Sequence, residues 1–334
     1  MGTGDAKAVL TRDADAVTAL VAAGGLLAAG RRVLVLLSGG QDSTCLLHLA
    51  VALCGPDAVR ALHVNYGLRP GAEADQAQVE ATCSALGVAL EVVRPPARTR
   101  PGNLQAWARE VRYRAAHERA GGGDIAAGHT ATDQLETVLY RLISSPSPRA
   151  LAGMARRSGP LIRPLLAVTR AETARYCVER GLAVCEDPSN AEGVFVRNRI
   201  RHELVPLLTE LHPGAAANVL ALARRVAEEH AVVEALVSER LDGREEVGLT
   251  ELAAWPPGLA AVAVQRLADA AAGGPAAGVA RRLGEIVAMG PDAALDLPGG
   301  VRARTRASRL AFERTPRVDA PITSLTQSDG AHPQ

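Results

Sequence analysis

The first half of the chain alternates between short apolar runs and longer segments with helical spacing. The apolar runs are rich in strand-forming residues and lie at 33–37, 59–64, 88–93 and 124–128. Between them, amphipathic helices are predicted at 44–53, 73–86 and 103–120. Strands that alternate with helices predict a parallel sheet with right-handed crossovers. In such a sheet, ligands bind at the carboxyl ends of the strands.

The pattern changes after about residue 204. Residues 217–241 predict one long helix, a mostly helical stretch follows to about 289, and 301–313 alternate as a final strand or hairpin. The fold class that we expect is α/β, with a parallel-sheet domain followed by a smaller, mostly helical α+β domain. The predicted divisions are an N-terminal helical segment at 1–30, then 31–216, 217–318 and a disordered tail at 319–334.

Composition narrows the class of protein. A chain of 334 residues favours two domains, and its net charge of +1 requires any basic surface to be local. The 2% of aromatic residues argues against a platform that stacks single-stranded bases. Five cysteines without a C-x-x-C pair indicate reduced thiols. With neither a signal peptide nor an apolar run of spanning length, we expect a cytoplasmic protein without a membrane partner.

The most informative motif follows the first strand and reads Ser38-Gly39-Gly40-Gln41-Asp42-Ser43. Two glycines allow the backbone to approach a ligand closely, and the start of the next helix offers unpaired N–H groups. A strand, a tight turn and a helix N-terminus together suit phosphate or pyrophosphate. No lysine follows, so the loop is not a Walker motif. The alternative is an ordinary turn in which Ser43 or Asp42 caps the helix.

Two further polar clusters precede the fourth strand. His63 and Asn65 share one face at the end of the second strand, and Arg69 could contact phosphate. The alternative for this segment is a loop whose polar groups are satisfied within the protein. Arg109 and Arg112 are three residues apart on the helix 103–120, so they are neighbours on its surface. Paired arginines suit phosphate recognition, although a solvated basic helix face is the alternative.

A carboxylate pair follows the fourth strand. His129, Asp133 and Glu136 are spaced by four and three residues, so they share a helix face. Such a pair could hold an ammonium group, hold Mg²⁺ or act as a base. The alternative is a capping box between Thr130 and Asp133, which explains Glu136 less easily.

Arginines gather in two later segments. The two groups are Arg197, Arg199 and Arg201, and Arg302, Arg304 and Arg306. The second group alternates with small or apolar residues, which places its side chains on one face of a strand. Such a density of arginines favours a polyanionic binding partner such as nucleic acid. The alternatives are a solubilising helix face for the first group and a charge-protected edge strand for the second.

Taken together, these segments resemble the tRNA(Ile)-lysidine synthetases of the pyrophosphate-loop (ATP-pyrophosphatase) superfamily. The matching pieces occur in the family's order and span about residues 31–210: 38–43, 63–69, 103–113, 128–137, 163–166, 187–190 and 195–201. The loop alone marks only the superfamily, whereas Asp-Pro-Ser-Asn at 187–190 and Phe-x-Arg-Asn-x-Ile-Arg at 195–201 are far more specific.

The resemblance implies a fold of the adenine-nucleotide alpha-hydrolase type and a two-step ligation. ATP would adenylate the wobble cytidine of an isoleucine tRNA with a CAU anticodon, and free L-lysine would then displace AMP to give lysidine. The implied cofactors are ATP and Mg²⁺. The catalytic domain would be 31–216, and 217–318 would contact tRNA. The residues fix no oligomeric state, and a homodimer is one option.

The resemblance also implies residue roles. The nucleotide site would comprise Ser38, Gly39, Gly40, Gln41, Asp42, Ser43, His63, Arg109 and Arg112. Asp42 would also hold the metal, Asp133 and Glu136 would bind lysine, and His129 would join these three carboxylates in catalysis. The tRNA contacts would be Arg197, Arg199, Arg201, Arg302, Arg304 and Arg306.

Two departures from the family pattern concern Tyr66, where a histidine is common, and the region 141–150, which lacks an Arg-Gly-x-Gly segment and contains prolines. The principal competing function is a tRNA thiolase, another pyrophosphate-loop enzyme. Thiolases require clustered cysteines, which this chain lacks. A glutamine-dependent synthetase would need a glutaminase domain, and a silent RNA-binding module would not need an intact loop.

Overall fold

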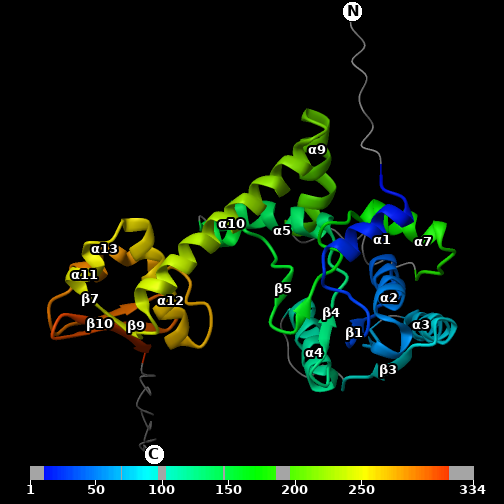
Figure 1. Cartoon of the computed structure of the whole chain (residues 1–334), viewed down its shortest axis with the longest axis horizontal. Coiled ribbons are helices and arrows are strands. Elements are labelled where there is room, and N and C mark those ends of the chain that lie inside the picture. The colour runs from blue at the N-terminus through cyan, green and yellow to red at the C-terminus, as the bar shows by residue number, and fades with distance from the viewer. Residues whose placement is uncertain (1–10, 69, 97–102, 146, 186–195, 316–334) are drawn as a thin grey trace, which may run out of the picture. The chain divides into compact units, whose positions relative to one another are not determined.

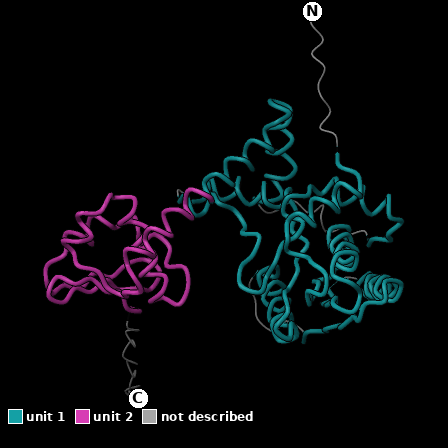
Figure 2. Tube along the Cα trace, in the orientation of Figure 1, with its two compact units in different colours: residues 1–227 teal, residues 228–334 magenta. Residues whose placement is uncertain are grey.

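The computed structural model describes residues 11–68, 70–96, 103–145, 147–185 and 196–315. The chain divides into two compact units, Met1–Ala227 and Glu228–Gln334, which Figure 2 colours separately. The division falls within the long helix α10, Ala215–Leu241. Arg69, the predicted turn at 187–190, Phe195 and the predicted tail lie outside the described residues.

The described part of unit 1 contains a six-stranded sheet in the order β3-β2-β1-β4-β6-β5. The strands are β1 Val33–Leu36, β2 Val59–Val64, β3 Ala89–Val93, β4 Asp124–Ala126, β5 Arg157–Ser158 and β6 Leu161–Ile162. All neighbours pair in parallel except β5 and β6, which are antiparallel. The predicted parallel sheet is therefore confirmed, but β5 and β6 were not predicted, because two residues give no periodicity.

The helices of unit 1 connect and cover these strands (Figure 1). They are α1 Ala14–Ala23, α2 Gln41–Cys54, α3 Ala72–Leu86, α4 Leu104–Arg119, α5 Ala131–Ser144, α6 Pro148–Leu151, α7 Arg170–Glu179, α8 Val196–Arg199 and α9 Val205–Leu211, with short helical turns at Pro56–Ala58 and Ile200–Leu204. Asn103 caps α4 by accepting from the N–H groups of Gln105 and Ala106, as its residue type predicts.

The central strand β1 is buried on both faces. Val33 and Val35 belong to a core shared with α1, α2 and α7, whereas Leu34 and Leu36 pack with Ala116 of α4. This three-layer arrangement explains why the strand reads as a continuous apolar run rather than an alternating one. Helices cover both faces, so the polar loops gather at the carboxyl edge of the sheet.

Unit 2 contains a four-stranded antiparallel sheet in the order β7-β10-β9-β8. Its elements are β7 Glu246–Gly248, α11 Leu249–Ala253, α12 Pro257–Ala272, a 3₁₀ turn Val279–Arg282, α13 Leu283–Val287, β8 Ala294–Leu297, β9 Val301–Arg306 and β10 Arg309–Arg314. The hairpin of β9 and β10 confirms the alternation at 301–313. The three-residue strand β7 was not predicted. Within the described residues, no helix is both long and apolar enough to cross a bilayer.

Candidate active site

The loop between β1 and α2 closes on itself at the carboxyl edge of the sheet. Gly39 has φ +89°, and a Cβ atom there would lie 2.6 Å from Cys185 Sγ, so only glycine fits. Ser43 Oγ donates to the Gly40 carbonyl at 2.9 Å and accepts from Ser38 N at 3.2 Å. Gly40 is the N-cap of α2, and no side chain caps it. The alternative in which Ser43 or Asp42 caps the helix is therefore wrong, and the first turn keeps its N–H groups for a ligand.

Asp42 lies in the first turn of α2 and meets α7. Thr173 Oγ1 donates to Asp42 Oδ1 at 2.5 Å, and Gln41 Nε2 donates to the Arg170 carbonyl at 2.8 Å. Burial raises the pKa of the Asp42 carboxyl, so a cation beside it would favour the ionised form. Thr173 and Arg170 could not be predicted here, because they lie about 130 residues beyond the loop and no local pattern marks them.

The loop after β4 packs directly against this turn. A Cβ atom at Gly128 would lie 3.2 Å from backbone atoms of Asp42 and Ser43. Any larger residue at 128 would push the two loops apart, since both contacts are backbone. This close approach brings the segment that follows Gly128 beside the turn of residues 38–43.

The segment after β2 has a largely structural role. His63 is buried, and its Nδ1–H donates to the Leu37 carbonyl at 2.9 Å, which leaves only Nε2 for a nucleotide. Asn65 Nδ2 donates to Glu73 at 3.2 Å. The Tyr66 hydroxyl donates to the Ala108 carbonyl at 2.7 Å, which fixes α4 against this segment. Tyr66 therefore positions the helix that carries Arg109 and Arg112.

Arg109 and Arg112 are exposed on α4. The Arg109 guanidinium lies 4.7 Å from the centre of the Tyr113 ring. Neither arginine makes an ion pair with a residue in the described ranges. They remain open cations near the edge of the sheet, as a phosphate-binding role requires.

Asp133 forms a capping box at the start of α5. Its Oδ2 accepts from Thr130 N and from Thr130 Oγ1, each at 2.8 Å. The predicted alternative, a capping box between Thr130 and Asp133, is therefore present and uses one oxygen of Asp133, Oδ2. The other, Oδ1, lies 3.6 Å from Arg201 Nη2 and accepts no hydrogen bond from a described residue.

Glu136 is 6% exposed and is held by Arg201. Arg201 Nε donates to Oε1 at 2.6 Å, and Nη2 donates to Oε2 at 3.0 Å. The hydrogen bonds that Arg201 donates to Glu136 raise the pKa of the Arg201 guanidinium. The sequence suggested different partners for the two residues, lysine for Glu136 and tRNA for Arg201. In the structure each neutralises the other across 65 residues of sequence, in the bidentate geometry of a strong ion pair.

His129 lies between the loop and the arginines. Its Nδ1 is buried without a hydrogen-bond partner among the described residues. Burial is the main reason why its pKa falls to about 4, and the positive charges of Arg163, Arg109 and Arg112 lower it further. The imidazole is therefore neutral at pH 7, able to accept a proton or a hydrogen bond but not to serve as a cation.

The predicted tRNA arginines differ in their partners. Arg199 pairs with Glu203 at 2.8 Å, and the Arg197 guanidinium lies 5.8 Å from the centre of the Tyr140 ring. On β9, Arg302 pairs with Asp296 at 2.7 Å and Arg304 with Glu313 at 3.2 Å.

Arg306 is exposed and makes no ion pair with a described residue. The strand that carries it, β9, lies between β8 and β10, so the edge-strand explanation of its arginines is wrong. Acidic residues on the two neighbouring strands neutralise most of this stripe.

The described residues contain no metal-binding cluster, and most of the cysteines are buried. No three His, Cys, Asp or Glu side chains there are arranged to hold a metal ion. Four of the five cysteines are buried: Cys45, Cys54, Cys83 and Cys177. Burial raises the pKa of the Cys83 and Cys177 thiols to about 11, so both stay protonated at neutral pH.

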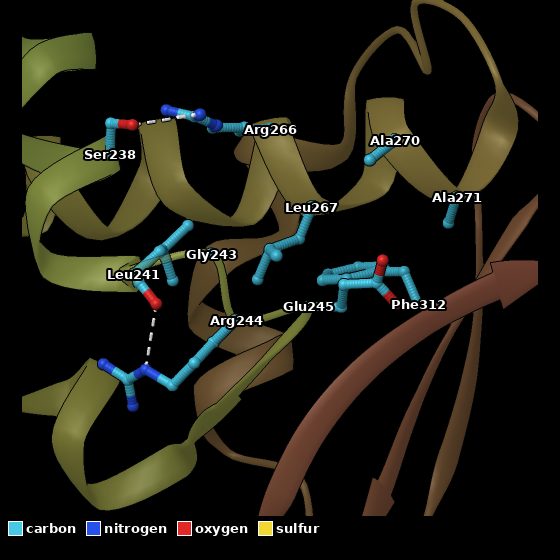
Figure 3. Close-up of a pocket in the computed structure, with 10 residues that line it drawn as sticks. All are labelled: Ser238, Leu241, Gly243, Arg244, Glu245, Arg266, Leu267, Ala270, Ala271 and Phe312. Atoms are coloured by element: carbon cyan, nitrogen blue, oxygen red, sulfur yellow. Dashed lines mark hydrogen bonds between the residues drawn. The ribbon is translucent and has the colours of Figure 1, made fainter.

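A cavity of about 300 Å³ lies within unit 2, between α10, α12 and β10 (Figure 3). Arg244 and Arg266 are among the residues that line it. Glu251 holds Arg244 at 2.9 Å, and Arg266 Nη2 donates to Ser238 Oγ at 3.2 Å. Its cationic groups therefore have protein partners, in contrast to those at the sheet edge of unit 1.

Comparisons with known proteins first define the class. Residues 10–208 match the PP-loop domain family. The U34-tRNA thiolase NcsA from Methanococcus maripaludis, solved with its [4Fe-4S] cluster, gives a TM-score of 0.54 at 17% identity, covering 64% of this chain and 78% of that chain. This likeness concerns the fold alone. The chain thus carries an ATP-binding PP-loop domain, and the predicted fold class is confirmed.

Relatives among curated proteins define the family. The tRNA(Ile)-lysidine synthase of Salinispora tropica is 40% identical over 299 residues, covering 83% of this chain and 89% of the relative. That of Nocardia farcinica is 39% identical over 217 residues, covering 65% and 68%. The chain therefore belongs to the tRNA(Ile)-lysidine synthase family, and the resemblance inferred from the motifs is confirmed.

Proposed function

We propose that this chain joins lysine to the wobble cytidine of an isoleucine tRNA with a CAU anticodon. ATP adenylates the cytidine, lysine displaces AMP, and the products are lysidine, AMP and pyrophosphate. Membership of the family supports this activity. The observation that carries it in the structure is the contact of Gly128 with Asp42 and Ser43, which joins the phosphate-binding turn to the carboxylates of α5.

ATP binding is assigned to the turn and to the open cations beside it. Gly39, Gly40 and Ser43 would hold pyrophosphate against the uncapped start of α2. Asp42 would hold Mg²⁺, which would neutralise phosphate charge when bound. The raised pKa of Asp42 supports this role, because a buried carboxylate is stabilised by a neighbouring cation. Arg109, Arg112 and Nε2 of His63 would complete the nucleotide contacts.

The lysine site is assigned to Asp133 and Glu136. Oδ1 of Asp133 accepts no hydrogen bond from a described residue and could accept one from an ammonium group, although Arg201 Nη2 lies 3.6 Å away. Glu136 can accept one only where Arg201 moves or shares its carboxylate. A lysine amine with a pKa of about 10.4 is protonated at pH 7 and must lose a proton before it attacks. Neutral His129 and these carboxylates are the acceptors available at the sheet edge.

Several assignments rest on the family resemblance and on exposure. Arg197 and Arg306 are exposed and would contact tRNA phosphates, with residues 217–318 as a tRNA-contacting region. Arg199, Arg302 and Arg304 would have to exchange a carboxylate for a phosphate. Exposed ion pairs are worth only about 0–1 kcal/mol, so such an exchange is feasible, but it gains less than a phosphate contact to an unpaired arginine. A cytoplasmic location and a homodimer stay predictions.

The thiolase alternative is less well supported. The thiolase NcsA shares the fold at 17% identity, whereas the lysidine synthases share about 40% of their residues with this chain. The buried, protonated thiols of Cys83 and Cys177 are also poorly suited to sulfur transfer.

The adenylation step provides the first test. Unmodified tRNA(Ile) transcript with a CAU anticodon is incubated with Mg²⁺ and ATP but without lysine, and pyrophosphate release is measured. We expect release that depends on the transcript. The matched control is the same transcript with uridine at the wobble position, which should support none. Equal release with both transcripts, or release without RNA, would contradict the proposal.

A further inference from the structure

Arg163, the first residue of the segment 163–166, is a buried cation that has no role in the reaction proposed above. It is 7% exposed and immediately follows β6, the strand paired in parallel with β4. The Ala127 N–H donates to the Ile162 carbonyl at 3.0 Å, so Arg163 lies beside the segment that leads to Gly128 and His129. Its side chain therefore belongs to the same carboxyl edge as the phosphate-binding turn.

The guanidinium of Arg163 is poorly satisfied. Nη1 donates to the Ala155 carbonyl at 2.6 Å, but Nε is buried without a hydrogen-bond partner among the described residues. No carboxylate of the described chain forms an ion pair with it. A guanidinium has five N–H donors, and burying one without an anion costs several kcal/mol or shifts its pKa. An unpaired buried arginine therefore needs an explanation.

The surroundings of Arg163 are cationic or neutral rather than acidic. Burial lowers the pKa of Arg163, the nearby Tyr113 hydroxyl opposes this, and the charges of Arg109 and Arg141 lower it further. The positive charge of Arg163 in turn disfavours protonation of His129. Cations that lower one another's pKa are stabilised by a bound anion, which relieves all of them at once.

We propose that Arg163 is a phosphate-binding residue, which takes a phosphate group of a substrate at the carboxyl edge of β6, beside His129. The planar guanidinium can donate two parallel hydrogen bonds to phosphate oxygens, and its unpartnered Nε is one of the donors required. The phosphate belongs either to ATP and its adenylate or to the tRNA backbone. The proposal rests on the proposed function, since both ligands are its substrates.

The competing explanation is a structural clamp. The bond from Nη1 to Ala155 closes the hairpin of β5 and β6, and this bond alone could justify an arginine. A clamp and a phosphate ligand make different predictions. Loss of a clamp lowers stability and leaves ligand affinity unchanged, whereas loss of a phosphate ligand lowers affinity for a phosphate-bearing substrate.

The test compares Arg163→Met and Arg163→Lys with wild type and with Arg157→Met. Arg157 lies on β5 of the same hairpin and pairs with Asp124 at the surface, so it is a matched control. Two ligands are titrated separately into the full chain: Mg-ATP without RNA, and an anticodon stem-loop RNA without ATP at several salt concentrations. Circular dichroism and thermal unfolding establish that each variant is folded.

We expect Arg163→Met to lower the binding affinity for one of the two ligands by about tenfold or more, because a hydrogen bond from a charged group is lost. Arg163→Lys keeps the positive charge but not the planar guanidinium, so its affinity should fall less than that of Arg163→Met. Arg157→Met should bind both ligands as wild type does. Weaker ATP binding alone identifies a nucleotide phosphate. Weaker RNA binding, with a salt slope reduced by about 1, identifies a tRNA phosphate.

A folded Arg163→Met that binds both ligands as wild type does would overturn the proposal in favour of the clamp. If Arg163→Met does not fold, Arg163→Lys provides the test. Weaker ligand binding at an unchanged unfolding temperature supports a phosphate site. Unchanged ligand binding at a lower unfolding temperature supports the clamp. Because these are binding measurements, the inference can fail while wild-type protein still forms lysidine, and the two failures are distinguishable.

Discussion

The two units both present arginines, but their partners differ. At the carboxyl edge of the sheet in unit 1, Arg109, Arg112 and Arg163 make no ion pair with a described residue. On β9 of unit 2, Arg302 and Arg304 each contact a carboxylate of a neighbouring strand. Density of arginines is therefore similar in the two places, whereas the free positive charge is concentrated in the first.

This difference indicates where an anion is needed. A cation that already contacts a carboxylate gains less from a phosphate, since it must give up one partner for another. A buried or clustered cation that has no carboxylate partner gains the full attraction of a bound phosphate. We therefore expect phosphate chemistry at the sheet edge of unit 1 and a weaker, more replaceable contribution from the β9 stripe.

The largest expected effect concerns Asp42, the carboxylate within the turn of residues 38–43. Asp42→Asn keeps the shape and the contact with Thr173 but removes the charge proposed to hold Mg²⁺. Pyrophosphate release should fall by about 100-fold or more, as expected for loss of a charge that stabilises a phosphoryl group. Thr173→Val is the control and should have a smaller effect. Near-normal release by Asp42→Asn would show that the loop is misassigned.

Glu136→Gln tests the carboxylate that Arg201 occupies. Lysine transfer should fall by about tenfold or more while adenylation of tRNA is largely retained, because the ammonium loses its partner. The variant should also unfold about 1–3 kcal/mol more easily, since Arg201 is left without its anion. Lysine kinetics and denaturant unfolding are measured on the same sample. Lower stability with unchanged lysine kinetics would reduce Glu136 to a structural partner of Arg201.

The β9 stripe is tested by the variant in which Arg302, Arg304 and Arg306 are all changed to Ala. Because Asp296 and Glu313 neutralise two of the three, the salt slope of tRNA binding should fall by about 1 rather than 3. The control is Arg309→Ala. Arg309 lies on β10 of the same hairpin and pairs with Glu246 of β7. A fall of the salt slope by about 3 would contradict the distinction drawn between the unpaired arginines of unit 1 and the paired arginines of unit 2. Unchanged affinity and slope would remove β9 from the tRNA contacts.

The smallest effect concerns the capping carboxylate. Asp133→Asn should lower stability by about 0.5–1 kcal/mol, as is typical for a weakened cap, and should also raise the lysine KM through loss of the open Oδ1 charge. Thr130→Ala removes the other half of the capping box and should lower stability without affecting lysine. If Asp133→Asn matches Thr130→Ala in both measurements, Asp133 only caps the helix.

The elements that the sequence predicted well are those with strong local signals. The strand β1 is an uninterrupted apolar run because it is buried on both faces, and α4 begins at the Asn103 cap that its sequence indicates. The strands β5, β6 and β7 escaped prediction because none of them lies in a longer apolar run, unlike the equally short β4 within the predicted strand 124–128. Local patterns thus locate the main layers and miss the short strands at their edges.

Pairing between distant side chains could not be predicted. Helical spacing placed Asp133 and Glu136 on one face, but nothing local indicated that Arg201 would bind Glu136. Strand alternation likewise placed three arginines together without revealing Asp296 and Glu313 on the flanking strands. Arg163 did carry a signal, a charged residue directly after the apolar pair Leu161–Ile162, although its burial became visible only in the fold.

The central claim is most directly tested by the chemical identity of the product. Transcript of tRNA(Ile) with a CAU anticodon is incubated with this protein, Mg-ATP and lysine labelled with ¹⁵N at the ε position. The nucleosides are then analysed by mass spectrometry. We predict that the wobble cytidine becomes lysidine carrying the label, and that neither ATP-free nor lysine-free reactions form it. An unmodified cytidine, or a thiolated nucleoside in its place, would contradict the account.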